Sequence, residues 1–215
     1  MLGLLPWRNE VNMDEPQVKE MRQMSFQPEI RAGENGKKMI AGYAVKWRQL
    51  SSPIWGIYLE KFERGAFADT LKERVNDIYA AWQHDVSETL GRSPTTLTVR
   101  EDDTGLWYEI DPPTWADRHI ESIERGDVRG SSFIFQAGAV EYDWESDPQY
   151  VIRTVKRAHL FEVSPVTLPA YPSSTTGVRG GEQADHVAEM IKAERARRQN
   201  TNRAYLERNR LLREI

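Results

Sequence analysis

Three polar side chains in this sequence have the types that nucleophilic catalysis requires: His84, Ser132 and Glu162. A serine hydroxyl is a poor nucleophile at neutral pH. It becomes effective when an imidazole accepts its proton and a third polar group fixes the tautomer of that imidazole. Each residue lies in a short hydrophobic segment, and the segments are Tyr79-Ala-Ala-Trp-Gln-His-Asp85, Gly130-Ser-Ser-Phe-Ile-Phe135 and His159-Leu-Phe-Glu-Val-Ser-Pro165. Because a triad is defined by geometry and occurs in several chain orders, separation along the chain does not exclude one here.

The alternation of side chains along a strand separates the two adjacent serines. Ser131 shares a strand face with Phe133 and Phe135, which we expect in the core. Ser132 shares the opposite face with Ile134 and is the serine expected at a cleft. Two serines in a strand are more often a hydrogen-bonding pair than a nucleophile, so this pattern alone leaves both interpretations open.

Two residues compete for the third position beside His84, which ends an apolar run where a strand meets a turn. His159 and Glu162 belong to one predicted strand, three positions apart, so they face opposite sides unless the strand bulges. Either side chain has the chemistry to orient an imidazole. His119 lies on a charged helical segment, and we expect it to be solvated.

Asp103-Thr104-Gly105 matches the triplet of aspartic proteases, which need two carboxylates that share a proton in an apolar setting. Here the triplet follows two acidic residues in a predicted exposed turn, so we interpret it as a hairpin turn. The sequence has no His-Glu-x-x-His motif, no glycine-rich phosphate loop and no Gly-x-Ser-x-Gly elbow. We therefore expect neither a metal nor a cofactor.

Short apolar and aromatic runs predict many strands and few helices. Strands are expected at 38–47, 77–83, 95–100, 106–110, 129–137, 139–144, 149–157 and 159–164. Helices are expected at 65–73 and 114–125, the second with an apolar stripe of Trp115, Ile120 and Ile123 that would pack on the sheet. This content predicts a mainly β fold, a closed β-barrel surrounded by a few helices.

Length and composition indicate one core domain with appendages. Hydrophobic residues make up 39% of the chain and include seven tryptophans, which is enough apolar material for a sizeable core. The absence of cysteine excludes disulfides, thiolate catalysis and cysteine-ligated zinc. No apolar run reaches the length of a membrane span, so we expect a soluble intracellular protein without membrane association.

The sequence divides into three predicted parts. Residues 1–22 are polar and contain two prolines, which predicts a flexible leader; residues 23–178 form the core domain; residues 179–215 form a linker and a charged tail, helical or disordered. Residues 181–215 hold eight Lys or Arg and six Asp or Glu. Nucleic-acid binding requires a dominant basic block, so we expect no nucleic-acid partner.

Seven short motifs give the sequence a family resemblance, because they follow one another in a known order. They are Glu63-Arg-Gly-Ala-Phe67, Trp82-Gln-His-Asp85, Gly91-Arg92, Glu101-Asp-Asp-Thr-Gly-Leu106, Ile123-Glu-Arg-Gly-Asp127, Gly130-Ser-Ser-Phe-Ile-Phe135 and Glu162-Val-Ser-Pro-Val-Thr-Leu-Pro-Ala-Tyr-Pro172. Each motif is weak alone, and the ordered set is specific. In these motifs the chain resembles the prohead (procapsid) maturation proteases of tailed phages, which are similar to the herpesvirus assemblin serine proteases.

The resemblance implies an assemblin-like β-barrel serine endopeptidase without metal or cofactor. Its catalytic residues map onto His84, Ser132 and Glu162; the herpesvirus enzymes use a second histidine as third member, which keeps His159 as the alternative. Its substrate is the major capsid protein or its scaffolding segment, and often the enzyme itself, inside the procapsid in the host cytoplasm. A homodimer or higher oligomer is implied. The family commonly has glycine where this chain has Ile134.

A rival hypothesis from another functional class fits the same fold. A non-catalytic capsid assembly or scaffolding protein would keep the core domain and bind coat protein through the helical tail.

Overall fold

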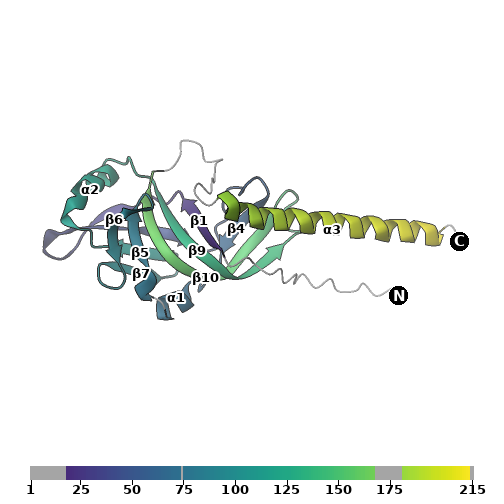
Figure 1. The fold of residues 1–215 in the computed structure, drawn as a ribbon, viewed down its shortest axis with the longest axis horizontal. Helices are drawn as coiled ribbons and strands as arrows, with labels where there is room; N and C mark the ends of the chain where they lie inside the picture. The colour runs from purple at the N-terminus through teal and green to yellow at the C-terminus, as the bar shows by residue number, and fades with distance from the viewer. Residues whose placement is uncertain (1–17, 74, 168–180, 214–215) are drawn as a thin grey trace.

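A computed structural model of the chain describes residues 18–73, 75–167 and 181–213, and β-strands are its main elements (Figure 1). The strands are β1 (Lys19–Met24), β2 (Glu29–Ala32), β3 (Lys38–Lys46), β4 (Tyr58–Phe62), β5 (Tyr79–Trp82), β6 (Asp85–Arg92), β7 (Leu97–Glu101), β8 (Gly105–Ile110), β9 (Gly130–Asp143) and β10 (Val151–Val166). The α-helices are α1 (Ala68–Glu73), α2 (Asp117–Glu124) and α3 (Gly181–Arg213), and short 3-10 turns are η1 (Glu34–Gly36), η2 (Val75–Asp77) and η3 (Thr114–Ala116).

The strands form two sheets. The larger sheet has the order β1-β9-β10-β5-β6, with β4 also paired to β10, and the smaller sheet has the order β2-β3-β8-β7. Their facing sides supply one apolar core, to which the smaller sheet gives Tyr108 and Ile110 and the larger sheet gives Phe133 and Phe135. Alternating inward apolar side chains are what strands of a half-buried sheet require.

The long strands β9 and β10 connect the parts of the larger sheet. Each was predicted as two strands and is continuous in the structure. The first part of β10 pairs in parallel with β4, and Glu162 and Val163 pair in parallel with β5. Between these two parts lies α1, where the Thr70 hydroxyl donates to the Ala158 carbonyl and accepts from the Leu160 amide. The helix thereby satisfies backbone groups of β10 that have no strand partner on that side.

The prediction of a mainly β fold with a few helices is confirmed, and a closed barrel is not shown. Among the described strands, the pairing leaves β1, β4 and β6 as edges of the larger sheet and β2 and β7 as edges of the smaller one. A barrel requires hydrogen bonds between the two edges of a sheet. Here one edge of β10 pairs first with β4 and then with β5, and the core is covered by the second sheet, which packs against the first.

The predicted helix at 114–125 is present as η3 followed by α2. Ile120 and Ile123 are buried as predicted. Trp115 was expected in the same apolar stripe but is 46% exposed. The reason is that it lies in η3, whose tighter turn takes it out of the 3.6-residue periodicity of α2.

The predicted leader overlaps with a strand at its end. Residues 19–22 belong to β1, which pairs with β9 in the larger sheet. The predicted domain end at 169–177 lies outside the described residues. The tail forms α3, which projects from the body of the molecule (Figure 1) and packs Val187 and Ile191 against Ile54, Tyr58, Tyr142 and Val151.

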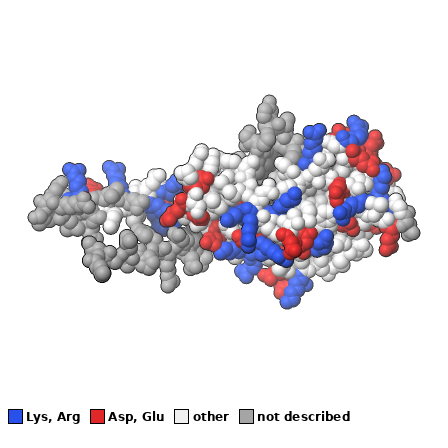
Figure 2. All heavy atoms as spheres, turned by 180° about the vertical axis from the view of Figure 1, so that it is seen from behind, with Lys and Arg blue, Asp and Glu red and all other residues white. Residues whose placement is uncertain are grey.

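The surface carries charges of both signs. On the face seen in Figure 2, acidic and basic side chains are interspersed over the described residues. Within the described ranges, no helix combines the length and the apolar composition that a membrane span requires.

Candidate active site

His84 lies at the tip of the hairpin that joins β5 and β6. Trp82 and Asp85 are partners in the pairing, so the turn between them contains only two residues. Both have positive φ, 54° for Gln83 and 64° for His84. This is the backbone of a type I′ turn, which follows the twist of the strands but disfavours residues other than glycine and asparagine. The imidazole is therefore presented from a strained position that the surrounding structure must hold.

Gln83 anchors this turn to the end of β10. Its main-chain nitrogen donates to the Pro165 carbonyl at 3.2 Å. Its side-chain nitrogen donates to the Thr167 hydroxyl at 2.9 Å, and its side-chain oxygen accepts from the main-chain nitrogen of Thr167 at 3.2 Å. Three hydrogen bonds across the two segments fix the orientation of the residue next to His84, which offsets the conformational cost of the turn.

Strand β9 places its two serines on opposite faces as predicted, but Ser132, which was expected at a cleft, is fully buried. Ser131 points into the core, where its hydroxyl lies 2.8 Å from the Tyr108 hydroxyl and donates to the Phe26 carbonyl at 2.9 Å. Ser132 is the cross-strand partner of Ser164 on the other face of the sheet. Direct partners in a pair of strands share a face, so this face also includes Ile134.

A bulge in β10 brings Glu162 to the face of Ser132. Leu160 pairs with Phe135, whereas Glu162 pairs with Ile134, so the register shifts between them at Phe161. Without the shift, Glu162 would share the core face of Leu160, which is fully buried. The extra residue turns the carboxylate to the opposite face. The same strand thus places Leu160 in the core and Glu162 beside Ser132.

The structure brings His84, Ser132 and Glu162 together in one chain of hydrogen bonds. The Nε2 atom of His84 lies 2.6 Å from Ser132 Oγ, and Nδ1 lies 2.7 Å from Glu162 Oε1. When the imidazole is neutral, a proton on Nδ1 is held by the carboxylate and Nε2 accepts the serine proton. This is the tautomer that a general base at Ser132 requires.

Glu162 accepts further hydrogen bonds that hold its carboxylate in place. Tyr79 donates to Oε2 at 2.8 Å and Ser164 donates to Oε1 at 2.6 Å. Burial is the largest single influence and raises the pKa of Glu162, but the hydrogen bonds from His84, Ser164 and Tyr79 together keep that pKa below its usual 4.5. The carboxylate is therefore ionised beside the imidazole. Burial and the bond to Glu162 also raise the pKa of Tyr79 to about 12.

His159, the alternative third member, is not the residue that contacts the imidazole. Both ring nitrogens of His84 face other groups, Ser132 and Glu162. The His159 ring lies against Phe161, with 4.4 Å between ring centroids. The geometry therefore favours Glu162 as the orienting group.

His119 was expected to be solvated and is buried, so this prediction was wrong. Its ring stacks on Trp82 with 4.0 Å between centroids, and its Nε2 lies 3.0 Å from Glu88 Oε2. Burial lowers the pKa of His119, while Glu88 opposes the effect. Because Trp82 precedes the His84 turn, α2 supports the hairpin through this stack.

Three residues contact the site but were not predicted as part of it, and the sequence indicated them to different degrees. Ser164 lies two positions from Glu162, so the strand period already placed it on the same face. Tyr79 begins the segment that contains His84, but nothing in the sequence indicated its contact with Glu162. Arg22, whose carbonyl oxygen accepts from Ser132 Oγ at 2.8 Å, lies in a strand that was not predicted.

Other candidate chemistry is not supported at the positions described. Asp103 is 89% exposed and pairs with Arg64, while Asp102 accepts from the amides of Thr104 and Gly105, so the triplet is the predicted turn. Among the described residues, no three His, Asp or Glu side chains are grouped so as to hold a metal ion.

A serine, an imidazole and a buried carboxylate linked in this order define the site geometry of serine hydrolases, here on a β-rich scaffold. The family model of the caudovirus prohead serine protease matches residues 23–189. The chain belongs to that family. No curated protein and no solved structure gave a significant match to the chain.

Proposed function

We propose that this protein is a serine endopeptidase of phage capsid maturation in which Ser132 is the nucleophile. Ser132 Oγ attacks the scissile carbonyl carbon while its proton passes to His84 Nε2. His84 then gives that proton to the leaving amine, and an ester to Ser132 remains. A water molecule attacks the ester, His84 takes one proton from it, and the serine hydroxyl regains its proton as the acid product leaves.

Glu162 acts in this scheme as a positioning residue. Its carboxylate holds the Nδ1 proton and stabilises the imidazolium that forms when Nε2 is protonated. The observation that carries the proposal is the pair of distances at His84, 2.6 Å to Ser132 Oγ and 2.7 Å to Glu162 Oε1. These lie within the range expected for a nucleophile, its base and the group that orients the base.

The proposed substrate follows from membership in the prohead protease family. The enzyme would cleave scaffold segments of the major capsid protein, and segments of itself, inside the procapsid in the host cytoplasm. An extended and accessible chain is the easiest to cleave, which favours such segments over folded domains. A homodimer or higher oligomer is part of the proposal and rests on the resemblance to assemblin.

Co-expression with the coat protein tests the proposal. We expect wild type to convert the coat protein into defined shorter fragments, and Ser132→Ala to leave it at full length, on the same gel. Ser131→Ala is the matched control because it removes the neighbouring hydroxyl from the core face. Identical fragments with wild type and Ser132→Ala would exclude Ser132 as the nucleophile.

A second candidate function is a non-catalytic assembly protein that binds coat protein through α3. The supporting observation is that α3 extends beyond the body of the molecule after docking through Val187 and Ile191 (Figure 1). The same gel separates the two proposals, since an assembly protein gives no fragments with any variant while still co-purifying with coat protein.

A further inference from the structure

Strand β1 pairs with β9 along the segment of β9 that contains Ser132. The two strands are antiparallel and paired from Lys19 with Gln136 to Met24 with Ser131, so Gln23 lies opposite Ser132. Ser132 is fully buried, with a relative exposure of 0%. A substrate carbonyl must approach Ser132 Oγ closely before the serine can attack it. In the structure, a main-chain carbonyl of β1 already lies there.

That carbonyl belongs to Arg22, and it competes for the proton that catalysis moves. Ser132 Oγ lies 2.8 Å from the Arg22 oxygen and 2.6 Å from His84 Nε2. A hydroxyl has one proton to donate. While that proton is held by the Arg22 carbonyl, it is not shared with the imidazole, and the nucleophile is not activated.

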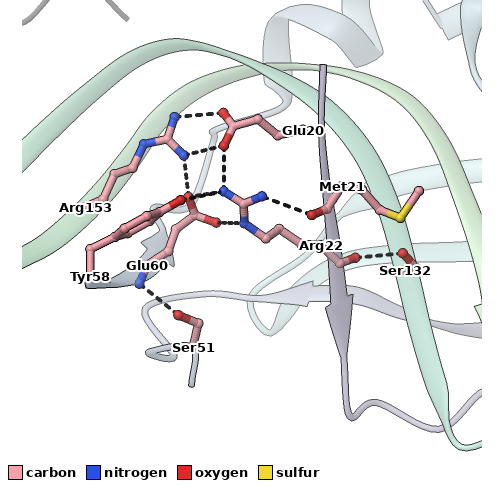
Figure 3. Close-up of polar contacts among 8 residues, drawn as sticks. All are labelled: Glu20, Met21, Arg22, Ser51, Tyr58, Glu60, Ser132 and Arg153. Atoms are coloured by element: carbon pink, nitrogen blue, oxygen red, sulfur yellow. Dashed lines mark hydrogen bonds and ion pairs between the residues drawn. The ribbon is translucent and has the colours of Figure 1, made fainter. Parts of the chain in front are cut away.

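A cluster of buried charges holds β1 in this position (Figure 3). Its members are Glu20 and Arg22 of β1, Glu60 of β4 and Arg153 of β10, with the Tyr58 hydroxyl beside them. Arg22 Nε lies 2.7 Å from Glu60 Oε1, and Arg153 Nη2 lies 2.8 Å from Glu20 Oε1. We call these four charged residues the ion cluster. The ion cluster joins β1 to β4 and β10, two strands that pair with each other and lie across β9 from β1.

We propose, on the basis of the function proposed above, that β1 occupies the position of the substrate backbone, and that peptide substrates bind there as extended strands antiparallel to β9 after β1 has moved away. An extended chain gains main-chain hydrogen bonds along an exposed strand edge whatever its sequence. β1 shows that such a chain fits beside β9 and brings a carbonyl to Ser132. The enzyme as described is therefore the closed form.

The composition of the ion cluster fits a contact that must open. Burying ion pairs costs desolvation that their attraction barely repays, so a charged contact holds β1 less firmly than an apolar one would. When β1 leaves, Glu20 and Arg22 return to water together. Glu60 and Arg153 remain paired with each other, which avoids an isolated buried charge.

A reversible cross-link tests whether β1 must move. The chain has no cysteine, so a pair introduced at Lys19→Cys and Gln136→Cys forms the single disulfide. Cross-strand partners have the Cα spacing that a disulfide needs. The link fixes one end of β1, and the chain continuing into β2 fixes the other. The readout is the rate at which a fluorophosphonate probe labels Ser132, followed by intact mass, with Ser132→Ala as the specificity control.

We expect the oxidised variant to label at least about tenfold more slowly than the same protein after reduction, because the link removes the open population. A second cysteine pair at Arg31→Cys and Met39→Cys, partners in β2 and β3, controls for cross-linking itself and should label equally in both states. Equal rates for the Lys19–Gln136 pair would overturn the proposal about β1 while leaving Ser132 as the nucleophile.

A loosened contact tests the same proposal in the opposite direction. Glu20→Ala removes one of the two carboxylates of the ion cluster. Glu60 is then the single carboxylate that pairs with Arg22 and Arg153, so β1 should bind to the sheet less firmly. We expect labelling at least about tenfold faster than wild type, as the open population rises by that factor. Glu29→Ala is the matched control, since Glu29 is an exposed glutamate of the neighbouring strand β2.

Unchanged labelling of Glu20→Ala, with the fold intact by circular dichroism, would contradict the proposal. No labelling of Ser132 in any variant, reduced or loosened, would overturn the proposed function together with it. The two failures are thus distinguishable, because only the second abolishes the reaction everywhere.

Discussion

Two buried polar clusters lie on the larger sheet, and they differ in whether a proton can move within them. The first is the triad cluster, made of His84, Ser132 and Glu162 with Tyr79 and Ser164. The second is the ion cluster of Glu20, Arg22, Glu60 and Arg153. Arg22 contacts both clusters: its side chain is part of the ion cluster, and its main-chain carbonyl accepts a hydrogen bond from Ser132 of the triad cluster (Figure 3).

The ion cluster has fixed charges. Burial alone would lower the pKa of Arg22, but Glu60 and the other groups around it raise that pKa above its usual value. Burial would raise the pKa of Glu20, but Arg153 and Arg22 lower it. Guanidinium groups do not give up protons in proteins. Depth of burial and charge therefore do not distinguish the proposed reactive site from the ion cluster. The distinguishing feature is an imidazole that lies between a hydroxyl and a carboxylate.

The largest effect we expect comes from removing the imidazole. His84→Ala should lower the rate of coat-protein cleavage on the order of 10⁴-fold or more, because Ser132 then has no base. Its free energy of unfolding should fall by on the order of 1–3 kcal/mol, the range for the hydrogen bond that is lost to the charged Glu162. The measurements are initial cleavage rates on gels and urea unfolding of the same preparations.

A double variant checks that the triad cluster acts as one unit. His84→Ala combined with Ser132→Ala should be no slower than the slower single variant, because either change already abolishes the shared proton transfer. Losses that multiply would show that the two residues act independently, and the hydrogen-bonded pair would not be the catalytic unit.

The ion cluster should give the reverse pattern. Glu60→Ala leaves Arg22 and Arg153 buried with one carboxylate between them, and breaking a buried pair in this way costs about 3–5 kcal/mol of stability. We expect urea unfolding to show this loss. Glu63→Ala, which removes a glutamate that pairs with Arg48 at the surface, is the matched control and should be nearly neutral. A stable Glu60→Ala protein would mean that the ion cluster does not hold the sheet.

Strands that pack through apolar side chains were predictable from the sequence, and the strand that is held by charges was not. The strands with alternating apolar residues, such as β3 and β8, were predicted because their inward side chains are hydrophobic. β1 was not, since its buried side chains are Glu20 and Arg22 and read as part of a polar leader. A strand that is held by charges has no apolar period to detect.

The candidate site was predictable to a similar extent. His84 and Ser132 followed from their hydrophobic segments and from the family motifs. The third member stayed open because strand alternation separates His159 from Glu162, and the bulge at Phe161 that changes these faces leaves no mark in the sequence. The closed barrel was expected from strand content, which does not report how strand edges pair.

A smaller effect is expected from the charge of Glu162. Its pKa in the fold lies below the usual 4.5, so its contribution to stability is complete above that value and is lost as the pH falls through the lower, folded pKa. Glu162→Gln should therefore be less stable than wild type at neutral pH by on the order of 1–3 kcal/mol, the range for a hydrogen bond to a charged group. The difference should shrink on acidification below 4.5.

Urea unfolding of both proteins at a series of pH values measures this difference. Glu29→Gln makes the same chemical change at an exposed position and reports the effect of the substitution itself. A wild-type advantage over Glu162→Gln that stays constant down to strongly acidic pH would contradict a lowered pKa at Glu162. The ion cluster is unchanged in both proteins, so its titration cancels from the comparison.

The smallest effect concerns a carboxylate outside both clusters. Asp103 is exposed and pairs only at the surface with Arg64, so Asp103→Ala should change neither the cleavage rate nor the melting temperature measurably. Asp102→Ala, one residue earlier, should lower the melting temperature, because Asp102 accepts hydrogen bonds from Thr104, Gly105 and Tyr43 that form the turn. Loss of cleavage in Asp103→Ala with an unchanged melting temperature would transfer the chemistry to this turn. An unchanged rate leaves the buried triad cluster as the place where a carboxylate matters for the reaction.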